Sequence, residues 1–204
     1  MRDDKGFDSW ATEYDTSVSQ TDTKDAYPFA GYNKLLRFVY EEIKKGHSKT
    51  VLDIGLGTGN IAKKLYDESY TVYGIDFSQS MIDIAQKKMP NSNLLKWDFS
   101  KGLPYKYEKF DYIISTYAFH HLTDDQKISL INGLKNYLNE GGQIIIGDIS
   151  FSNNEKLNDC KKSYLEDWDE DEFYFVYKNI KDRLEYKNVA YTQISFCAGV
   201  YIIS

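Results

Sequence analysis

The sequence is poor in cysteine and has no long apolar run. Its 204 residues include only two cysteines, Cys160 and Cys197, which lack C-x-x-C spacing, so a disulfide framework is not expected. No apolar run approaches the roughly 20 residues that cross a bilayer, and the polar start Met1–Lys5 is unlike a signal peptide. These absences predict a cytoplasmic protein that does not bind a membrane.

Basic residues are in the minority. The chain has 25 lysines and arginines against 31 aspartates and glutamates, a formal net charge of −6. This balance argues against nucleic acid as a partner, because phosphate binding needs clustered basic side chains. Hydrophobic residues make up 42% and charged residues 27%, which is typical of globular proteins. Without an internal repeat or a low-complexity linker, this length predicts one continuous domain.

What the sequence does contain is a glycine-rich stretch at residues 51–60. An apolar run that includes Asp53 is followed by Gly55, Gly57 and Gly59, and then by an amphipathic segment. This order predicts a buried parallel strand, a tight turn and the start of a helix. Glycines let a ligand approach the backbone, and the unpaired N–H groups of the helix start favour an anionic group. We therefore expect a small ligand with a negatively charged end over Gly55–Gly59.

The spacing of these glycines distinguishes between ligands. The dinucleotide fingerprint is G-x-G-x-x-G, but here Asn60 stands where that fingerprint has its third glycine. D-x-G-x-G-x-G instead resembles motif I of the class I S-adenosylmethionine (AdoMet)-dependent methyltransferases. The resemblance implies AdoMet as cofactor and S-adenosylhomocysteine as product, with Asp53 and the three glycines at the cofactor site. An NAD-dependent oxidoreductase is the less favoured alternative.

A second candidate side chain follows the next predicted strand, residues 71–75. Asp76 lies about 20 residues beyond the first glycine, where nucleoside-binding βαβ units place the acid that binds ribose. An ionised carboxylate accepts hydrogen bonds from both ribose hydroxyls. A helix cap is the alternative role, but Ser78 already stands where the following helix would be capped. We therefore favour ribose binding by Asp76, with Phe77 either packing on the adenine or belonging to the core.

A third strand-end acid, Asp98, follows the short predicted strand 93–97 and precedes Phe99. In the methyltransferase family an acid at this position hydrogen-bonds the exocyclic amine of adenine, so the resemblance implies cofactor contacts for Asp98 and Phe99. An exposed loop aspartate is the alternative. Asp53, Asp76 and Asp98 all fall at the carboxyl ends of strands, the edge where ligands of open α/β sheets bind.

The resemblance is most specific after the fourth predicted strand, residues 110–115. F-D-x-I-x-S-x-x-x-x-H-H-L is similar to motif IV of class I small-molecule methyltransferases, and S-T-Y-A-F-H-H-L-T-D-D resembles small, largely uncharacterised bacterial members. It adds Ser115 to the cofactor-site candidates. His120 and His121 are the candidates for a general base near the strand ends. Neighbours on a helix point about 100° apart, so we expect at most one histidine to face the pocket, and packing or capping is the commoner role.

A metal site is not predicted. Adjacent histidines do not easily share one ion, and no third ligand with recognisable spacing accompanies them. The acidic run 166–172 is expected to be a solvated surface.

The polar first 24 residues contain one aromatic island, Trp10–Asp15. W-x-x-x-Y-D resembles a segment that, in small-molecule methyltransferases, precedes the core and closes over the methionine end of the cofactor. The resemblance makes Tyr14 a candidate site residue. A surface strap is the alternative.

Apolar periodicity predicts the order of the remaining elements. Helices are expected at 26–46, 58–68, 79–89 and 123–139, the last with a Thr123–Gln126 capping box and a Gly141-Gly142 end, then a strand at 143–149, a mostly helical 152–185, and strands 189–196 and 200–203 around Gly199.

The resemblance implies a three-layer α/β sandwich around a mostly parallel, seven-stranded Rossmann-like sheet whose last strand is antiparallel. The single domain 1–204 is expected to comprise an N-terminal lid and helix (1–46), an AdoMet-binding core (47–151), a variable substrate region (152–185) and a terminal strand pair (186–204).

The acceptor class follows from the residues after the fourth strand. Ser115-Thr116-Tyr117-Ala118 stands where enzymes that methylate amino groups of adenine or glutamine carry an N-P-P-Y-type tetrapeptide, and no nucleic-acid-reading domain is appended. We therefore predict a small soluble acceptor. A non-catalytic AdoMet-binding or regulatory module is the alternative, because fold and cofactor site do not prove chemistry. The sequence carries no signal for the oligomeric state.

Overall fold

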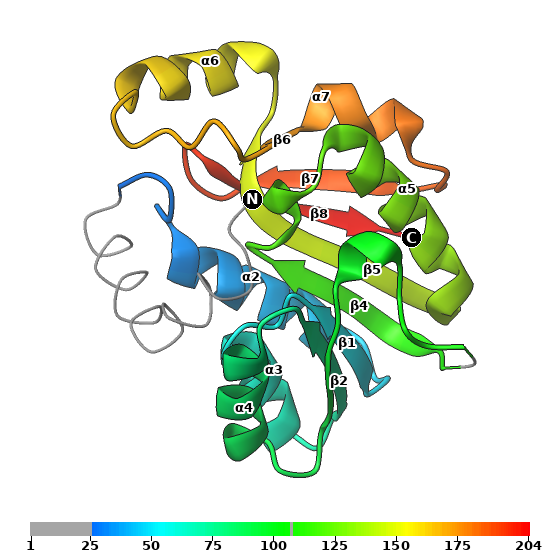
Figure 1. The fold of residues 1–204 in the computed structure, drawn as a ribbon. Coiled ribbons are helices and arrows are strands. Elements are labelled where there is room, and N and C mark those ends of the chain that lie inside the picture. The colour runs from blue at the N-terminus through cyan, green and yellow to red at the C-terminus, as the bar shows by residue number, and fades with distance from the viewer. Residues whose placement is uncertain (1–25, 107) are drawn as a thin grey trace.

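The structure, a computed structural model, describes residues 26–106 and 108–204 (Figure 1). Within these residues no helix is both long and apolar enough to cross a membrane. The strands are β1 (Thr50–Ile54), β2 (Thr71–Asp76), β3 (Asn93–Lys96), β4 (Phe110–Thr116), β5 (Leu138–Phe151), β6 (Phe175–Val176), β7 (Val189–Gln193) and β8 (Ala198–Ile203). The α-helices are α2 (Tyr32–Lys44), α3 (Asn60–Asp67), α4 (Gln79–Lys88), α5 (Asp124–Leu134), α6 (Asn154–Ser163) and α7 (Tyr177–Ile180). Short 3-10 turns are η1 (Phe99–Lys101), η2 (Phe119–His121), η3 (Lys135–Tyr137) and η4 (Lys181–Arg183).

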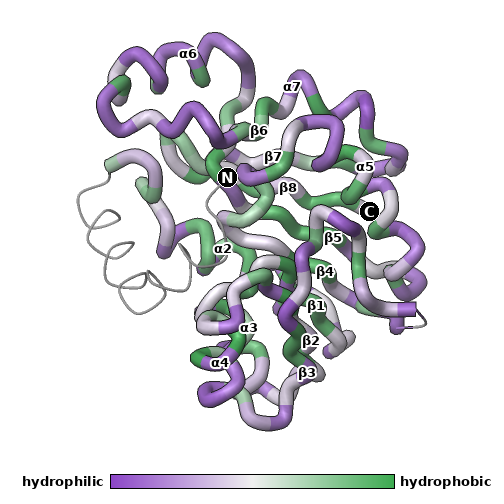
Figure 2. Tube along the Cα trace, viewed as in Figure 1, coloured by the Kyte–Doolittle hydropathy of each residue, from purple (hydrophilic) through white to green (hydrophobic). Residues whose placement is uncertain are grey.

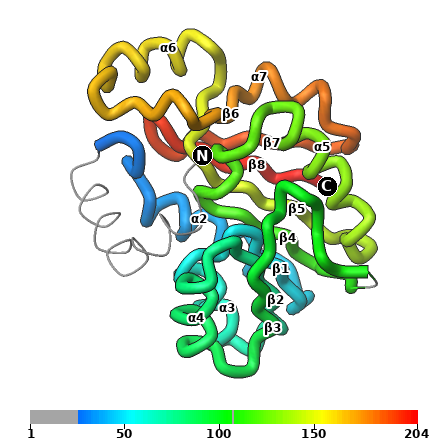
Figure 3. The backbone as a smooth tube through the Cα atoms, in the orientation of Figure 1, coloured from blue at the N-terminus to red at the C-terminus, as the bar shows by residue number. Residues whose placement is uncertain are grey.

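The strands form one sheet in the order β3-β2-β1-β4-β5-β8-β7, and β6 pairs with β5 beside this order. Strands β1 to β5 run parallel, whereas β8 is antiparallel to both β5 and β7. The chain proceeds outward from β1 to β3 and then returns to β4 on the other side of β1 (Figure 3). Ligands of such sheets bind where the order reverses, beyond the carboxyl ends of the strands.

The sheet separates two hydrophobic cores and so forms the middle of three layers. Leu52 and Ile54 of β1 belong to the core with α5 and α7, whereas Val51 belongs to the core with α2, α3 and α4. Successive side chains of a strand point to opposite faces, so this apolar strand is buried on both sides. Figure 2 shows hydrophobic strands and a largely hydrophilic α6. The predicted three-layer α/β fold with an antiparallel last strand is confirmed.

Two helices begin at their predicted caps. The hydroxyl of Ser78 accepts a hydrogen bond from the N–H of Met81 at 3.2 Å. Thr123 and Gln126 form a reciprocal capping box at the start of α5. These local signals hold because each cap needs only neighbouring backbone groups.

The end of α5 differs from the prediction. The helix stops at Leu134, and β5 begins at Leu138, which pairs with Phe110 ahead of a register shift. Gly142 therefore lies inside a strand and does not end a helix. A Cβ there would come within 3.1 Å of the carbonyl oxygens of Phe110 and Asp111, so glycine permits a close approach of two backbones.

The C-terminal region also differs. Residues 152–185 are not mostly helical, because an irregular segment follows α6 and β6 then adds an eighth strand to the sheet. Gly199 lies within β8 and not in the turn before it. A Cβ at Gly199 would lie 2.5 Å from the ring of Tyr191 on β7, which explains why a glycine stands inside this strand.

Candidate functional site

Three glycines form the turn between β1 and α3. Their φ angles are positive, 71° at Gly55, 55° at Gly57 and 81° at Gly59, a conformation that glycine adopts without strain. A Cβ at Gly55 would lie 2.4 Å from the Cβ of Ala118, and one at Gly59 would lie 2.8 Å from the Cε of Met89. A Cβ at Gly57 would meet nothing within 4 Å. Gly57 is therefore the glycine that faces open space.

This open space is a pocket of about 490 Å³. One part of its wall comes from the carboxyl edge of the sheet, since Gly55 follows β1, Asp76 ends β2 and Thr116 ends β4. Further parts come from the segment before α2 and from the segment between α6 and β6. The predicted site residues on this wall are Gly55, Gly57, Asp76, Phe77, Phe99, His120 and His121.

Asp76 joins the glycine turn to the start of α4. Its carboxylate oxygens accept hydrogen bonds from the N–H groups of Gly57 and Ser78, each at 2.9 Å, and only 6% of the residue is exposed. Because the hydroxyl of Ser78 caps α4, capping is not the role of Asp76. Each carboxylate oxygen can accept a second hydrogen bond, as a ribose-binding role requires.

Asp53 is buried in β1 and does not reach the pocket wall. Neither of its carboxylate oxygens has a hydrogen-bond partner among the described residues. Burial, together with the nearby charge of Asp76, raises the pKa of Asp53 to about 8. A positively charged ligand group held nearby would favour the ionised form of this carboxyl.

The other predicted cofactor residues are placed differently. Phe99 lines the pocket, but Gly59 and Ser115 do not. The hydroxyl of Ser115 donates to the carbonyl of Ile54 at 2.8 Å and so joins β4 to β1. Tyr14 lies outside the described residues.

Asp98 is also off the pocket wall. Its carboxylate accepts hydrogen bonds from the N–H and the hydroxyl of Ser100, at 3.0 and 2.6 Å, and so caps η1. Partial burial opposes its charge, but the bonds from Ser100 and Lys101 outweigh burial and hold the pKa of Asp98 below its usual value. The adenine contact of Asp98 stays a prediction.

His120 and His121 both line the pocket, with ring centroids 4.2 Å apart. The expectation that at most one would face the pocket is wrong, because it assumed a continuous α-helix. The histidines instead end the 3-10 turn η2, after which Leu122 is extended with φ −98° and ψ 143°. The α-helix begins only at Asp124.

Asp148 of β5, which sequence analysis missed, fixes the ring of His120. Its Oδ1 lies 2.7 Å from Nδ1 of His120, and its Oδ2 accepts hydrogen bonds from the N–H groups of Phe119 and His120 at 2.9 and 3.2 Å. Burial is the largest single effect on each group and opposes its charge, but the attraction and the hydrogen bond between the two side chains, with smaller contributions from Glu172 and the N–H of Ile149, together outweigh it. The pKa of Asp148 is therefore held below its usual value, and that of His120 is raised.

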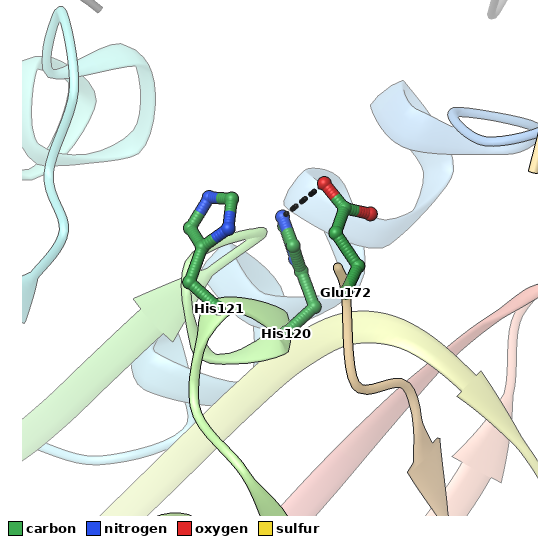
Figure 4. A group of neighbouring side chains, drawn as sticks. All are labelled: His120, His121 and Glu172. Carbon is green, nitrogen blue, oxygen red and sulfur yellow. Dashed lines mark ion pairs between the residues drawn. The ribbon is translucent and has the colours of Figure 1, made fainter. Parts of the chain in front are cut away.

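Glu172 reaches this end of the pocket from a distant part of the chain. Its Oε1 lies 3.6 Å from Nε2 of His120, and its Oε2 accepts a hydrogen bond from the hydroxyl of Tyr174 at 2.8 Å. The side chains of His120, His121 and Glu172 project to the same side (Figure 4). The histidines come from η2, and Glu172 comes from the segment before β6.

The acidic run 166–172 is not only the solvated surface that its composition suggested. Asp167, Asp169, Asp171 and Glu172 line the pocket, within the irregular segment between α6 and β6. No local pattern reveals this, because the segment consists of turns and irregular backbone, and only its packing brings these side chains to the pocket.

Comparisons with known proteins identify the family. A family model described as a methyltransferase domain matches residues 51–142. An uncharacterized methyltransferase of Oceanobacillus iheyensis is 35% identical over 208 residues, which cover 97% of this chain and 94% of that protein. Another, of Anoxybacillus flavithermus, is 42% identical over 149 residues, which cover 73% of this chain and 68% of that protein. The chain belongs to the class I AdoMet-dependent methyltransferases.

This methyltransferase shares its fold with solved members. The magnesium protoporphyrin IX methyltransferase of Synechocystis, with bound SAH, has 18% sequence identity and a TM-score of 0.66. The match covers 85% of this chain and 83% of that one. The likeness is one of fold.

The pocket of this methyltransferase fits AdoMet on three observations. Because residue 57 is a glycine, the space that a side chain at this position would fill is open to a ligand. Asp76 presents a carboxylate on the wall beside it. The uncompensated carboxylate of Asp53 suits a ligand that carries a sulfonium and an ammonium group.

We expect Asp53→Asn to change how the stability of the ligand-free enzyme depends on pH. The carboxyl titrates near 4 when unfolded and near 8 when folded, so the native state binds the extra proton between these values. The stability contributed by protonated Asp53 is thus present below about pH 4 and falls as the pH rises toward 8.

Melting temperatures from pH 5 to 8.5 check this expectation. The melting temperature of the Asp53→Asn variant should gain on that of the wild type steadily as the pH increases. Asp111→Asn provides a control, because Asp111 accepts hydrogen bonds from Thr50 and Asn139 in a partly exposed site. Parallel pH profiles for wild type and Asp53→Asn would contradict the raised pKa of Asp53.

Proposed function

We propose that this methyltransferase transfers the AdoMet methyl group to a small acceptor held at the histidine end of the pocket. One observation carries the proposal: Gly57 and Asp76 line the same pocket as His120, His121 and Glu172. When bound, AdoMet supplies a methyl group already activated on a sulfonium. The protein must therefore hold an acceptor in line with that methyl group and exclude water.

The proposed cofactor site uses the residues around the glycine turn. Asp76 accepts hydrogen bonds from the ribose hydroxyls, and the open backbone at Gly57 lets the ligand approach closely. Phe77 and Phe99 supply apolar surface for the adenine. Four further residues belong to the proposal. The charge of Asp53 favours the positively charged cofactor, and Gly59 and Ser115 shape the glycine turn and the strand before it. Asp98 is proposed to bind the exocyclic amine of adenine. Tyr14 is proposed to close over the methionine end.

The proposed acceptor site is the polar end of the pocket. An acceptor hydroxyl, thiol or protonated amine must lose a proton as the new bond forms. His120, His121 and Glu172 are the groups positioned to assist that loss. A volume of about 490 Å³ shared with the cofactor favours a small acceptor. The aspartates beside Glu172 oppose a polyanion such as nucleic acid.

Calorimetric titration tests the proposal first. We expect micromolar binding of AdoMet, binding of S-adenosylhomocysteine that is comparable or tighter, and no binding of NAD. Formation of S-adenosylhomocysteine in the presence of a panel of small hydroxyl, thiol and amine acceptors then separates an enzyme from a non-catalytic binding module. Binding of NAD in place of AdoMet would overturn the interpretation of Gly55–Gly59.

A further inference from the structure

His120, His121 and Glu172 present donor atoms of the kinds that bind transition-metal ions. One nitrogen of each histidine and one carboxylate oxygen of Glu172 all lie within 4.8 Å of one another. Bonds of about 2.0–2.2 Å around tetrahedral Zn²⁺ place donor atoms about 3.4 Å apart. Nε2 of His120 and Oε1 of Glu172 are already 3.6 Å apart, so small side-chain rotations would complete the site (Figure 4).

His120 and Glu172 are each oriented by a partner behind the metal-binding atom, as metal ligands commonly are. The Nδ1 of His120 is hydrogen-bonded to the buried carboxylate of Asp148 at 2.7 Å, which leaves Nε2 as the donor on the pocket side. The Oε2 of Glu172 accepts a hydrogen bond from the hydroxyl of Tyr174, which leaves Oε1 directed at His120. Asp148 and Tyr174 thus act as positioning residues.

The backbone holds the carboxylate and the histidines in one framework. The N–H of Phe173, the residue after Glu172, donates to the carbonyl of His120 at 2.8 Å. The buried side chain of Lys127 on α5 donates to the carbonyl of Phe173. Glu172 is therefore anchored to η2 and α5 although it belongs to an irregular segment.

We propose that one divalent transition-metal ion, such as Zn²⁺, Fe²⁺ or Co²⁺, binds to three donor atoms. These are Nε2 of His120, one ring nitrogen of His121 and one carboxylate oxygen of Glu172. Two imidazoles and a carboxylate suit these ions better than Mg²⁺ or Ca²⁺, which prefer oxygen ligands. Three protein ligands leave a coordination position for a hydroxyl, thiol or carboxylate of the acceptor. The place of the acceptor rests on the proposed function, whereas the metal site does not. This proposal revises the expectation of no metal, which rested on sequence spacing.

Direct metal titration tests this site without relying on activity. Tag-free full-length protein is treated with a chelator, dialysed, and titrated with Zn²⁺ by calorimetry and with Co²⁺ by visible absorption, in the absence of AdoMet. We expect one ion per chain and the absorption band of Co²⁺ in a nitrogen and oxygen site. Glu172→Gln and His121→Ala should weaken binding at least tenfold. Asp148→Asn should weaken it about 10–100-fold, as loss of an outer partner does.

Asp169→Asn is the matched control, because it removes an acidic charge from the same pocket wall without removing a donor, and it should change the affinity less than twofold. Melting curves identify any variant that fails to fold. A protein that binds no stoichiometric ion, or binds one equally well after Glu172→Gln, would overturn the metal site. Titration of the same sample with AdoMet distinguishes the two proposals: AdoMet binding without metal binding rejects the metal site alone, whereas absence of both rejects the proposed function as well.

Discussion

Asp148→Ala should lower the free energy of unfolding by about 3–5 kcal/mol, the range for removing one partner of a buried ion pair. The carboxylate accepts hydrogen bonds from the N–H groups of Phe119, His120 and Ile149 and pairs with Nδ1 of His120. Without it, three buried N–H groups lose their acceptor, and Nδ1 of His120 loses its hydrogen-bond partner in a buried site.

Urea unfolding followed by circular dichroism measures this loss. Asp159→Ala is the control, since Asp159 lies on the exposed face of α6 and its removal should change stability by less than about 0.5 kcal/mol. Asp148→Asn keeps one carbonyl oxygen as an acceptor and should fall between the two. A loss below about 1 kcal/mol for Asp148→Ala would show that the His120–Asp148 pair does not stabilise the fold as these contacts indicate.

Sequence patterns sufficed for the parts of the fold that are specified locally. The strand β1 lies where the apolar run before the glycines predicts a strand, because an apolar run ended by a glycine turn has few alternatives. The caps of α4 and α5 were predictable for the same reason, as Ser78 and Thr123 act on backbone groups three residues away. The glycine turn and Asp76 were found because both stand at strand ends.

The histidine end of the pocket could not be predicted, because its residues meet only through tertiary contacts. In the sequence, Asp148 looks like an ordinary strand residue. Only the pairing of β5 with β4 brings its carboxylate to His120 in η2. Glu172 belongs to an acidic run whose composition suggests solvent, and only the pairing of β6 with β5 and the Phe173–His120 backbone bond bring it to the histidines. The prediction that only one histidine would face the pocket used the period of an α-helix, whereas His120 and His121 lie in a 3-10 turn.

Asp76→Ala should lower the affinity for AdoMet at least tenfold. The substitution removes the acceptor of two charge-assisted hydrogen bonds to the ribose, each worth about 1.5–3 kcal/mol. It also releases the N–H groups of Gly57 and Ser78, so part of the loss would come from a less ordered glycine turn. Calorimetric titration measures the affinity, and melting curves show whether the fold is retained.

Two further aspartates separate a ribose contact from general electrostatics. Asp83→Ala removes an exposed acid on α4 that bonds only Gln79 among the hydrogen bonds described, so affinity should stay within twofold. Asp98→Ala removes the cap of η1. A comparable loss of AdoMet affinity in this variant would support the adenine contact of Asp98, which would place the adenine past Phe99 on the pocket wall. Unchanged AdoMet affinity in Asp76→Ala would refute the ribose role. No other carboxylate of the described residues both lines the pocket and binds the N–H of Gly57, so none could take the place of Asp76.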